Sequence, residues 1–170
     1  MKVTSTGIID GIIQDRFGKG GTQFAPSGMA TYSLPVGISE APPGTVSYAL
    51  FLEDKDAVPV CGFSWIHWTV AGLTRTKLEE NESIHAKDFV QGTNSQSGKL
   101  GNLSRMEAAC YAGMSPPDAP HLYELHAYAL DFMPALKTGF YMNELFHAMH
   151  GHILAEAVVS GMYFDKITSK

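Results

Sequence analysis

The stretch that decides the fold is Val46 to Glu53, with the sequence VSYALFLE. It is almost continuously apolar over the length of one strand, which predicts a β-strand covered on both faces. Two further strands are predicted at Ser64 to Val70, SWIHWTV, and at Leu122 to Phe132, LYELHAYALDF. In both of these, successive side chains are expected to alternate between the two faces. The three segments together predict a mainly β protein.

Glycine and proline interrupt the rest of the chain frequently, with 17 Gly and 9 Pro among 170 residues. Such dense punctuation predicts many strands and long loops. Short strands are expected at Met29 to Val36, Asp88 to Gln91 and Val158 to Phe164, and Ile8 to Ile13 is expected to form an early strand or an extended arm. Because strands and helices do not alternate, a doubly wound sheet is not expected, and the pattern favours a β-sandwich.

One helix is expected near the C-terminus, over Asn143 to Ala157, NELFHAMHGHILAEA. Asn143 is a favourable N-cap residue. One stripe at helical spacing would contain Leu145, Met149, His152 and Ile153. Gly151 weakens the middle of this segment and would allow a break there.

Composition limits the classes of function. Hydrophobic residues make up 45% of the chain and charged residues 17%, which is typical of a globular protein. The net charge is −5 and the 12 Lys and Arg residues form no basic run, so nucleic-acid binding is not expected. A chain of 170 residues favours a single domain, residues 1–170.

Location and redox state can also be predicted. The N-terminal stretch, MKVTSTGIIDGIIQDRFG, lacks the apolar core of a signal peptide. No stretch approaches the ~20 apolar residues of a membrane span. We therefore expect a cytoplasmic protein without a transmembrane segment, in which Cys61 and Cys110 are reduced thiols.

Four polar side chains near the predicted strands could carry chemistry. Asp54 follows directly on the buried strand, where sites are common, although aspartate is also favoured in solvated turns. His67 lies between two tryptophans, and a buried histidine satisfied by its neighbours is the plain alternative to a functional one. His121 and Tyr123 follow a Pro-rich loop. Imidazole N–H and phenol O–H groups would suit an anion, and Asp54 could orient an imidazole.

Strand alternation assigns faces to these residues. In the strand from Ser64 to Val70, one face is expected to hold Trp65, His67 and Thr69 and the other Ile66, Trp68 and Val70. In the next long strand, the shared face is expected to hold His121, Tyr123, Leu125, Ala127 and Ala129. Alternation alone does not show that the two polar faces meet.

A metal site and a hydrolytic site are the alternatives to an anion pocket. His147 and His150 could share a helix face, but His152 lies about 140° round the helix from His147, and no HExxH motif is present. The candidate nucleophiles of a hydrolase using the Asp and His cluster are Ser64, Ser104 and Ser115. None of the three lies in a GxSxG turn, and the chain has no glycine-rich phosphate loop.

Six segments carry a resemblance to a known family. They are Ala41-Pro42-Pro43-Gly44-Thr45, LEDKDA at 52–57, Trp65-Ile66-His67-Trp68, QGTN at 91–94, YAGMSPPDAPHLYELHAYALD at 111–131 and AMHGHILAEAVVSGMY at 148–163. Their shared order and spacing make the match specific. On these segments the chain resembles the phosphatidylethanolamine-binding protein (PEBP) family, in its bacterial Raf-kinase-inhibitor-like branch. The resemblance implies two antiparallel sheets packed in a Greek-key sandwich, with helix near the C-terminus.

The resemblance also implies a ligand pocket. Its ligand-binding residues would be Asp54, His67, Pro117, His121 and Tyr123. Residues supporting the pocket would be Asp56, Trp65, Tyr111 and Gly113. The implied activity is non-catalytic binding of phosphate, a phospholipid head group such as phosphorylethanolamine, a phosphorylated side chain or a carboxylate, with no cofactor. Some members of the family inhibit kinases or proteases, and bacterial members often form homodimers.

The sequence departs from the family pattern around this pocket. Lys55 and Val58 stand where prolines are usual, and Leu122 replaces a common arginine. Met114 and Ser115 lie in a loop that usually reads Gly-Pro-Cys in the bacterial branch. The stretch over residues 92–110 is longer than usual. Lys55 is therefore expected either to add positive charge at the pocket rim or to point to solvent.

Overall fold

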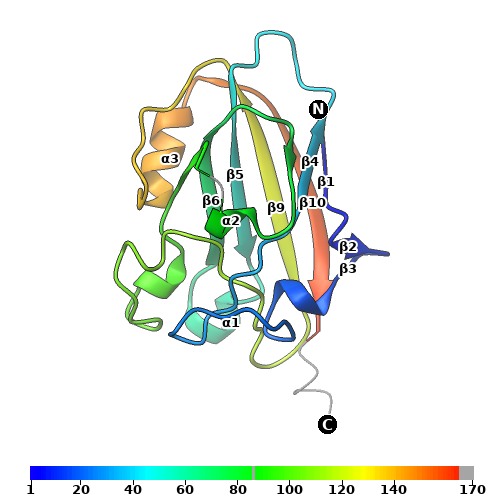
Figure 1. The fold of residues 1–170 in the computed structure, drawn as a ribbon, viewed down its shortest axis with the longest axis vertical. Coiled ribbons are helices and arrows are strands. Elements are labelled where there is room, and N and C mark those ends of the chain that lie inside the picture. Colours follow the sequence, from blue (N-terminus) through cyan, green and yellow to red (C-terminus); the bar gives the residue numbers. More distant parts are fainter. Residues whose placement is uncertain (86, 165–170) are drawn as a thin grey trace.

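The computed structural model describes residues 1–85 and 87–164, and it contains two β-sheets (Figure 1). The larger sheet has seven strands in the order β2 (Ile8–Ile9), β3 (Ile12–Ile13), β10 (Ile153–Tyr163), β9 (His121–Leu130), β5 (Ser47–Asp54), β6 (Trp65–Leu73) and β8 (Val90–Gln91). The smaller sheet has three strands in the order β1 (Lys2–Thr4), β4 (Val36–Ser39) and β7 (Lys77–Leu78). All strand pairs are antiparallel except β3 with β10. The expected fold class, mainly β with two packed sheets, is confirmed.

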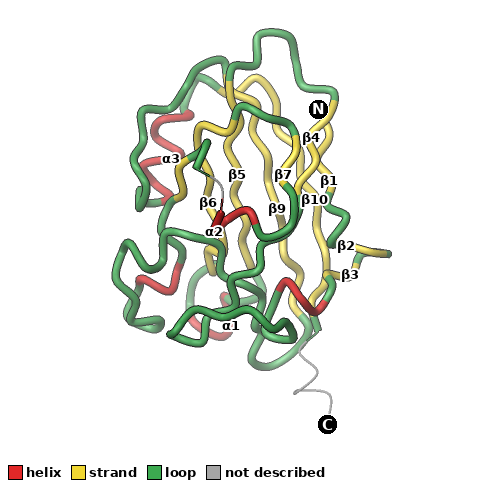
Figure 2. Tube along the Cα trace, viewed as in Figure 1, coloured by secondary structure: helices red, strands yellow, loops and turns green. Residues whose placement is uncertain are grey.

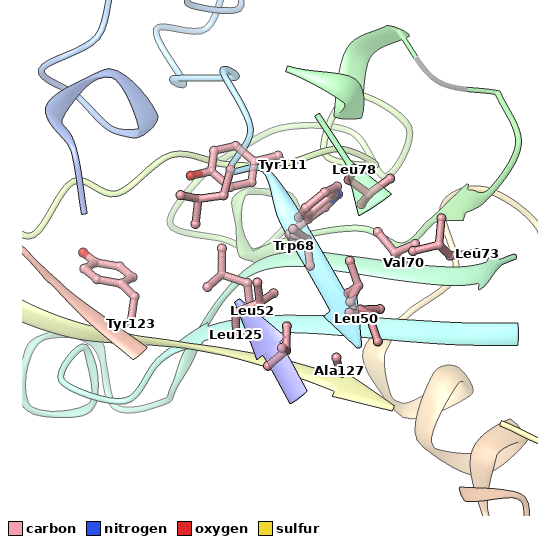
Figure 3. Close-up of a cluster of buried hydrophobic side chains, with 14 of the residues drawn as sticks. Leu50, Leu52, Trp68, Val70, Leu73, Leu78, Tyr111, Tyr123, Leu125 and Ala127 are labelled. Carbon is pink, nitrogen blue, oxygen red and sulfur yellow. The ribbon is translucent and has the colours of Figure 1, made fainter. Parts of the chain in front are cut away.

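Strand β5 lies at the centre of the fold, and all eight of its residues are buried. Leu50 and Leu52 pack into a core that is shared with the three-stranded sheet and with Trp68 and Leu125 (Figure 3). Phe51, on the other face, packs into a second cluster beneath the late helix. The sequence prediction of a strand covered on both faces is therefore confirmed, and the two faces of β5 pack into different clusters.

Loops and short helices gather at the end of the large sheet where β5 ends and β9 begins (Figure 2). The α-helix nearest this end is α1 (Val58–Cys61), and a second short helix, α2 (Glu82–His85), crosses in front of the sheet (Figure 1). Two 3-10 turns, η1 (Asp15–Phe17) and η2 (Ser95–Ser97), lie in the long loops. This end of the sheet is where the functional side chains come together.

A β-bulge in β6 overturns part of the predicted alternation. Leu52 and Glu53 are adjacent on β5, whereas their partners on β6, Trp68 and Ile66, are two residues apart. His67 is therefore the extra residue of the bulge, and a bulge shifts the alternation that follows it. Trp68 thus lies on the same side of the sheet as His67, while Thr69, opposite Phe51, turns to the other side. The prediction that His67 and Trp68 lie on opposite faces is wrong.

The C-terminal segment is half helix and half strand, so the predicted helix over Asn143 to Ala157 is wrong in its second half. Helix α3 (Met142–Met149) begins after Tyr141, whose N–H donates to the Glu144 carboxylate at 2.7 Å. Gly151 then adopts a φ of 80°, which ends the helix. The following residues form β10, which pairs with β9, so tertiary pairing overrides the local helical pattern. Within the described residues, no helix is long and apolar enough to cross a membrane.

Two further strand predictions need correction. The segment Met29 to Val36 is not a strand, since β4 begins only at Val36. Its Ser33 bonds to loop residues instead, accepting from the backbone N–H groups of Asn81 at 3.0 Å and Ser83 at 3.1 Å. The segment Ile8 to Ile13 is a hairpin of two short strands rather than one strand. The other predicted strands are present to within a few residues.

Candidate functional site

A cavity of about 260 Å³ opens at the end of β5, β6 and β9. Strand side chains that line it are Asp54, Trp65, His67, His121 and Tyr123. The Pro-rich loop before β9 contributes Gly113, Ser115 and Pro117. The remaining wall consists of Ala57, Val60, Cys61, Gln96 and Leu100. The structure therefore brings all five residues expected to bind ligand to one cavity.

The floor of the cavity holds a buried carboxylate–imidazole pair. Asp54 on β5 lies opposite Tyr123 on β9, which brings its carboxylate beside His121. The Asp54 Oδ2 atom lies 2.8 Å from His121 Nδ1, and the two side chains are only 5% and 3% exposed. The other carboxylate oxygen accepts from the Ala57 backbone N–H at 3.1 Å. Asp54 therefore orients His121, and its own two oxygens are already bonded.

The second nitrogen of His121 faces another carboxylate. His121 Nε2 lies 3.0 Å from Asp118 Oδ1, and the Asp118 side chain is 58% exposed on the Pro-rich loop. Burial lowers the pKa of His121, but the hydrogen bonds to Asp54 and Asp118 outweigh it, so the pKa is raised from its ordinary value. Because a carboxylate only accepts, His121 donates both ring N–H groups in this arrangement, one to the buried Asp54 and one to the exposed Asp118.

His67 supplies a neutral ring to the same cavity. Its Nδ1 lies 2.7 Å from the Ala112 carbonyl oxygen, and since a carbonyl only accepts, Nδ1 carries the proton. Burial lowers the pKa of His67, against the smaller opposing influence of the Ala112 carbonyl and Asp54. The ring is therefore neutral, and Nε2 is a hydrogen-bond acceptor. The ring packs edge-to-face against the Tyr123 ring, with 5.1 Å between the ring centroids.

Tyr123 completes the polar floor as an uncharged phenol. It is 1% exposed, and burial raises its pKa, with the Asp54 carboxylate acting in the same direction. The site therefore offers one charged donor, one neutral acceptor and one phenol.

Two of the four expected supporting residues do not line the cavity. Asp56 accepts from the Leu122 backbone N–H at 2.8 Å and so ties the turn after β5 to the start of β9. Tyr111 is fully buried and its O–H donates to the Phe17 carbonyl at 2.7 Å, which makes it a core residue beneath the loop. Trp65 and Gly113 are both in the cavity wall, and Trp65 stacks on Phe63 at 5.7 Å.

The departures from the family pattern have defined places. The Lys55 ammonium lies 2.5 Å from Glu124 Oε2, on the face of the sheet opposite to the cavity, so it adds no positive charge to the rim. Leu122 is 39% exposed and lies outside the cavity wall. Ser115, in contrast, lies within the wall. The two cysteines are free thiols, and burial raises the pKa of Cys110 to about 11.

Sequence reasoning missed the most informative residue of the site, Asp118. It lies three residues before His121, within the loop PPDAP, and a charged residue at that distance in a loop carries no specific pattern. The apolar wall from α1 and the loop after η2 was also missed, because neither a four-residue helix nor a loop has a periodicity that indicates which apolar side chains face a cavity.

The site differs from the Ser-His-Asp arrangement of a hydrolase at one position. An aspartate that orients a histidine is also part of the Ser-His-Asp arrangement, but here the group on Nε2 is a carboxylate rather than a hydroxyl. Ser64 donates instead to Glu53 Oε2 at 2.7 Å, away from the pocket. The three late histidines do not form a metal-like group among the described residues, and His152 is paired with Asp131.

Comparison with known proteins fixes the family. The family model described as phosphatidylethanolamine-binding protein matches residues 4–164, which is nearly the whole chain. The chain belongs to the phosphatidylethanolamine-binding protein family. Among PEBP relatives, the uncharacterized protein YxkA of Bacillus subtilis is 39% identical over 152 residues, covering 86% of this chain and 90% of that protein.

Further relatives agree with the PEBP assignment. A UPF0098 protein of Chlamydia trachomatis is 36% identical over 135 residues, covering 77% of this chain and 81% of its own length. The crystal structure of a PEBP homologue from Chlamydia trachomatis has a TM-score of 0.78 at 30% identity, covering 97% of both chains. The structure of YbcL from Escherichia coli has a TM-score of 0.76 at 22% identity, over 97% of this chain and 98% of that one, and shows the same fold.

Proposed function

We propose that this PEBP-family chain is a non-catalytic binding protein that recognises a small ligand through an oxyanion group, a phosphate monoester or a carboxylate. The observation that carries the proposal is the carboxylate of Asp118, which lies 3.0 Å from Nε2 of the buried His121 imidazolium. Because His121 Nε2 already binds a carboxylate oxygen of the protein's own loop, it would bind an oxyanion of a ligand in the same way. Because the Asp118 side chain is 58% exposed, it can leave without unfolding the site.

His67 adds a requirement on the ligand. Its Nε2 accepts a hydrogen bond because Nδ1 donates to Ala112. A monohydrogen phosphate group has both functions needed here, since its O–H can donate to His67 while its other oxygens accept from His121. A fully ionised carboxylate can accept from His121 but has no O–H group to donate to His67. We therefore expect phosphate monoesters to bind more tightly than acetate.

The size of the cavity favours a head group over a large molecule. Its volume of about 260 Å³ is slightly below the range of roughly 300–1,000 Å³ that is usual for drug-sized ligands. Phosphorylethanolamine or a phosphorylated side chain is of the appropriate size. Trp65, Val60 and Leu100 in the wall would contact the apolar part of such a ligand.

Calorimetric titration at pH 6 and 7 tests the proposal, with inorganic phosphate, phosphorylethanolamine and acetate as separate probes. We expect saturable one-to-one binding of the two phosphates and weaker binding of acetate. A chain that binds none of the three probes would contradict the proposal. Turnover of a phosphoester or ester substrate by the purified chain, lost in His67→Ala, would instead support the alternative of a hydrolase.

The wider setting of the protein follows from the family resemblance. A kinase or protease target would be recognised by a pull-down that His121→Ala abolishes, because the pocket would form part of the docking face. A homodimer and a cytoplasmic location are also predictions, which light scattering and cell fractionation would check.

A further inference from the structure

A second polar cluster lies on the face of the large sheet that points away from the cavity. It consists of Glu53 on β5 with Glu124 and His126 on β9, two strands that run side by side (Figure 1). Glu53 lies opposite Glu124 in the register, and its neighbour Asp54 faces the cavity, so Glu53 faces the other way. One ligand atom from each of the three side chains lies within 4.8 Å of the other two.

The imidazole of His126 is oriented so that Nε2 faces Glu53. Its Nδ1 lies 3.1 Å from Glu156 Oε1 on β10, and a carboxylate only accepts, so Nδ1 carries the proton. In the neutral ring this leaves the lone pair on Nε2. That Nε2 atom is buried and has no hydrogen-bond partner among the described residues. It lies 3.4 Å from Glu53 Oε1 without a hydrogen bond between them, so a cation between the two atoms, either a proton or a metal ion, would satisfy both.

Glu53 is oriented in a matching way. Its Oε2 atom accepts from the Ser64 hydroxyl at 2.7 Å, which leaves Oε1 turned toward His126. The side chains of Glu53 and His126 are each only 12% exposed, so neither is free to turn away into solvent. Metal sites commonly hold their ligands by such outer hydrogen bonds, with a carboxylate on the far nitrogen of the histidine.

Lys55 already places a positive charge at this cluster. Its Nζ lies 2.5 Å from Glu124 Oε2 and 3.4 Å from Glu53 Oε1. The side chain is 55% exposed, so its ammonium group can move into water when another cation arrives. Because the ammonium end of this ion pair is exposed, water competes with it and weakens the pair. Lys55 satisfies the two carboxylates but makes no bond to Nε2 of His126.

We propose that Glu53, Glu124 and His126 form a binding site for a divalent transition-metal ion of the zinc class, which displaces the ammonium group of Lys55. One nitrogen and two carboxylate oxygens match the ligand preference of Zn²⁺. Tetrahedral Zn²⁺ with bonds of about 2.0–2.1 Å separates its ligand atoms by about 3.3 Å. The observed 3.4 Å between His126 Nε2 and Glu53 Oε1 agrees with that spacing. Three protein ligands leave a coordination position for water.

Titration of the full chain with zinc chloride in a non-chelating buffer tests the proposal by calorimetry. We expect saturable one-to-one binding that disappears in His126→Gln and in Glu124→Gln. Glu156→Gln, which removes only the orienting carboxylate, should weaken binding roughly 10- to 100-fold. Lys55→Met, which removes the competing charge, should strengthen it roughly two- to fivefold.

Two matched controls separate this site from other histidines. His150→Gln changes one of the three histidines near the C-terminus, and His121→Gln changes the cavity. Both variants should bind zinc as tightly as the unsubstituted chain. Circular dichroism checks that each variant is folded. If a variant of Glu53, Glu124 or His126 does not fold, the expected gain of zinc affinity in Lys55→Met still tests the proposal. Absence of saturable zinc binding, or undiminished binding by folded His126→Gln, would overturn it. Because Glu124 is outside the cavity, phosphate binding by Glu124→Gln should be unchanged, which separates this proposal from the proposed function.

Discussion

The chain contains two histidine–aspartate pairs with the same bond and different surroundings. His121 Nδ1 lies 2.8 Å from Asp54, and His152 Nδ1 lies 2.8 Å from Asp131. The side chains of the first pair are 3% and 5% exposed, and those of the second are 46% and 45% exposed. The same hydrogen-bond distance therefore occurs once in the floor of a cavity and once at the surface.

Burial is what distinguishes the first pair from the second. Water competes for and screens the bond between His152 and Asp131, so that pair contributes little. At His121 the protein replaces water with fixed partners, since the carboxylate of Asp54 is also held by the Ala57 N–H. The result is an imidazolium with a raised pKa whose second N–H is available to one oxyanion at a time. Position in the sheet, rather than the type of residue pair, therefore distinguishes the two sites.

Removing the carboxylates should give the largest difference between the two pairs. Asp54→Ala leaves a buried imidazole without its partner, so we expect the free energy of unfolding to fall by about 3–5 kcal/mol. Asp131→Ala should change it by less than about 1 kcal/mol. Urea denaturation at pH 6 measures both. Equal losses in the two variants would mean that burial does not distinguish the pairs.

Removing the histidines should separate the pairs by ligand affinity. His121→Gln loses a charge-assisted hydrogen bond to the ligand, worth about 1.5–3 kcal/mol, so phosphorylethanolamine should bind roughly 10- to 150-fold more weakly. His152→Gln should bind as the unsubstituted chain does. Calorimetry at pH 6 measures both, and a loss of affinity in His152→Gln of the same size would contradict the assignment.

The stability that is lost in His121→Gln should depend on pH. The pKa of His121 is raised in the folded state, so its stabilising contribution is complete below the unfolded value of about 6.5 and is lost as pH rises through the folded pKa. The stability lost in His121→Gln should therefore be largest near pH 5.5 and shrink above pH 7. The lowered pKa of His67 makes stability change with pH in the opposite direction. Because His67 is present in both the unsubstituted chain and His121→Gln, its contribution cancels in the difference between them. Denaturation across pH 5–9 checks this, and a loss that grows with pH would contradict it.

The smallest expected effect concerns Asp118. Asp118→Asn removes the charge that competes with the ligand at His121 Nε2, so phosphate should bind roughly two- to fivefold more tightly at pH 6. The exposed Asp131→Asn serves as the control and should have no effect. Weaker binding by Asp118→Asn would show that Asp118 helps to hold the ligand rather than competing with it.

Much of the fold could be predicted from particular stretches of sequence. VSYALFLE is buried on both faces, as its continuous apolar character predicts. The shared face of His121, Tyr123 and Leu125 follows from regular alternation, since β9 pairs with β5 without a bulge at those positions. The meeting of His67 with His121 came only from the family resemblance, because no local pattern reports which strands are neighbours.

The remaining features depend on contacts between distant segments. The bulge at His67 shows only in the pairing of β6 with β5, and without it His67 and Trp68 would lie on opposite faces. Residues 153–157 have a helical pattern but become a strand because β9 offers them a partner. The role of Asp118 depends on how a Pro-rich loop folds back on His121, which neither composition nor spacing predicts.

The most direct test of the site is a long-range ¹H–¹⁵N NMR spectrum of the histidine rings at pH 7, with and without phosphorylethanolamine. We expect His121 to be doubly protonated and its Nε2 resonance to move saturably with ligand. His67 should be neutral with the proton on Nδ1, and the resonances of His152 should stay unchanged. A neutral His121, or ligand shifts that are equal at His121 and His152, would contradict the claim that the buried pair forms the binding site.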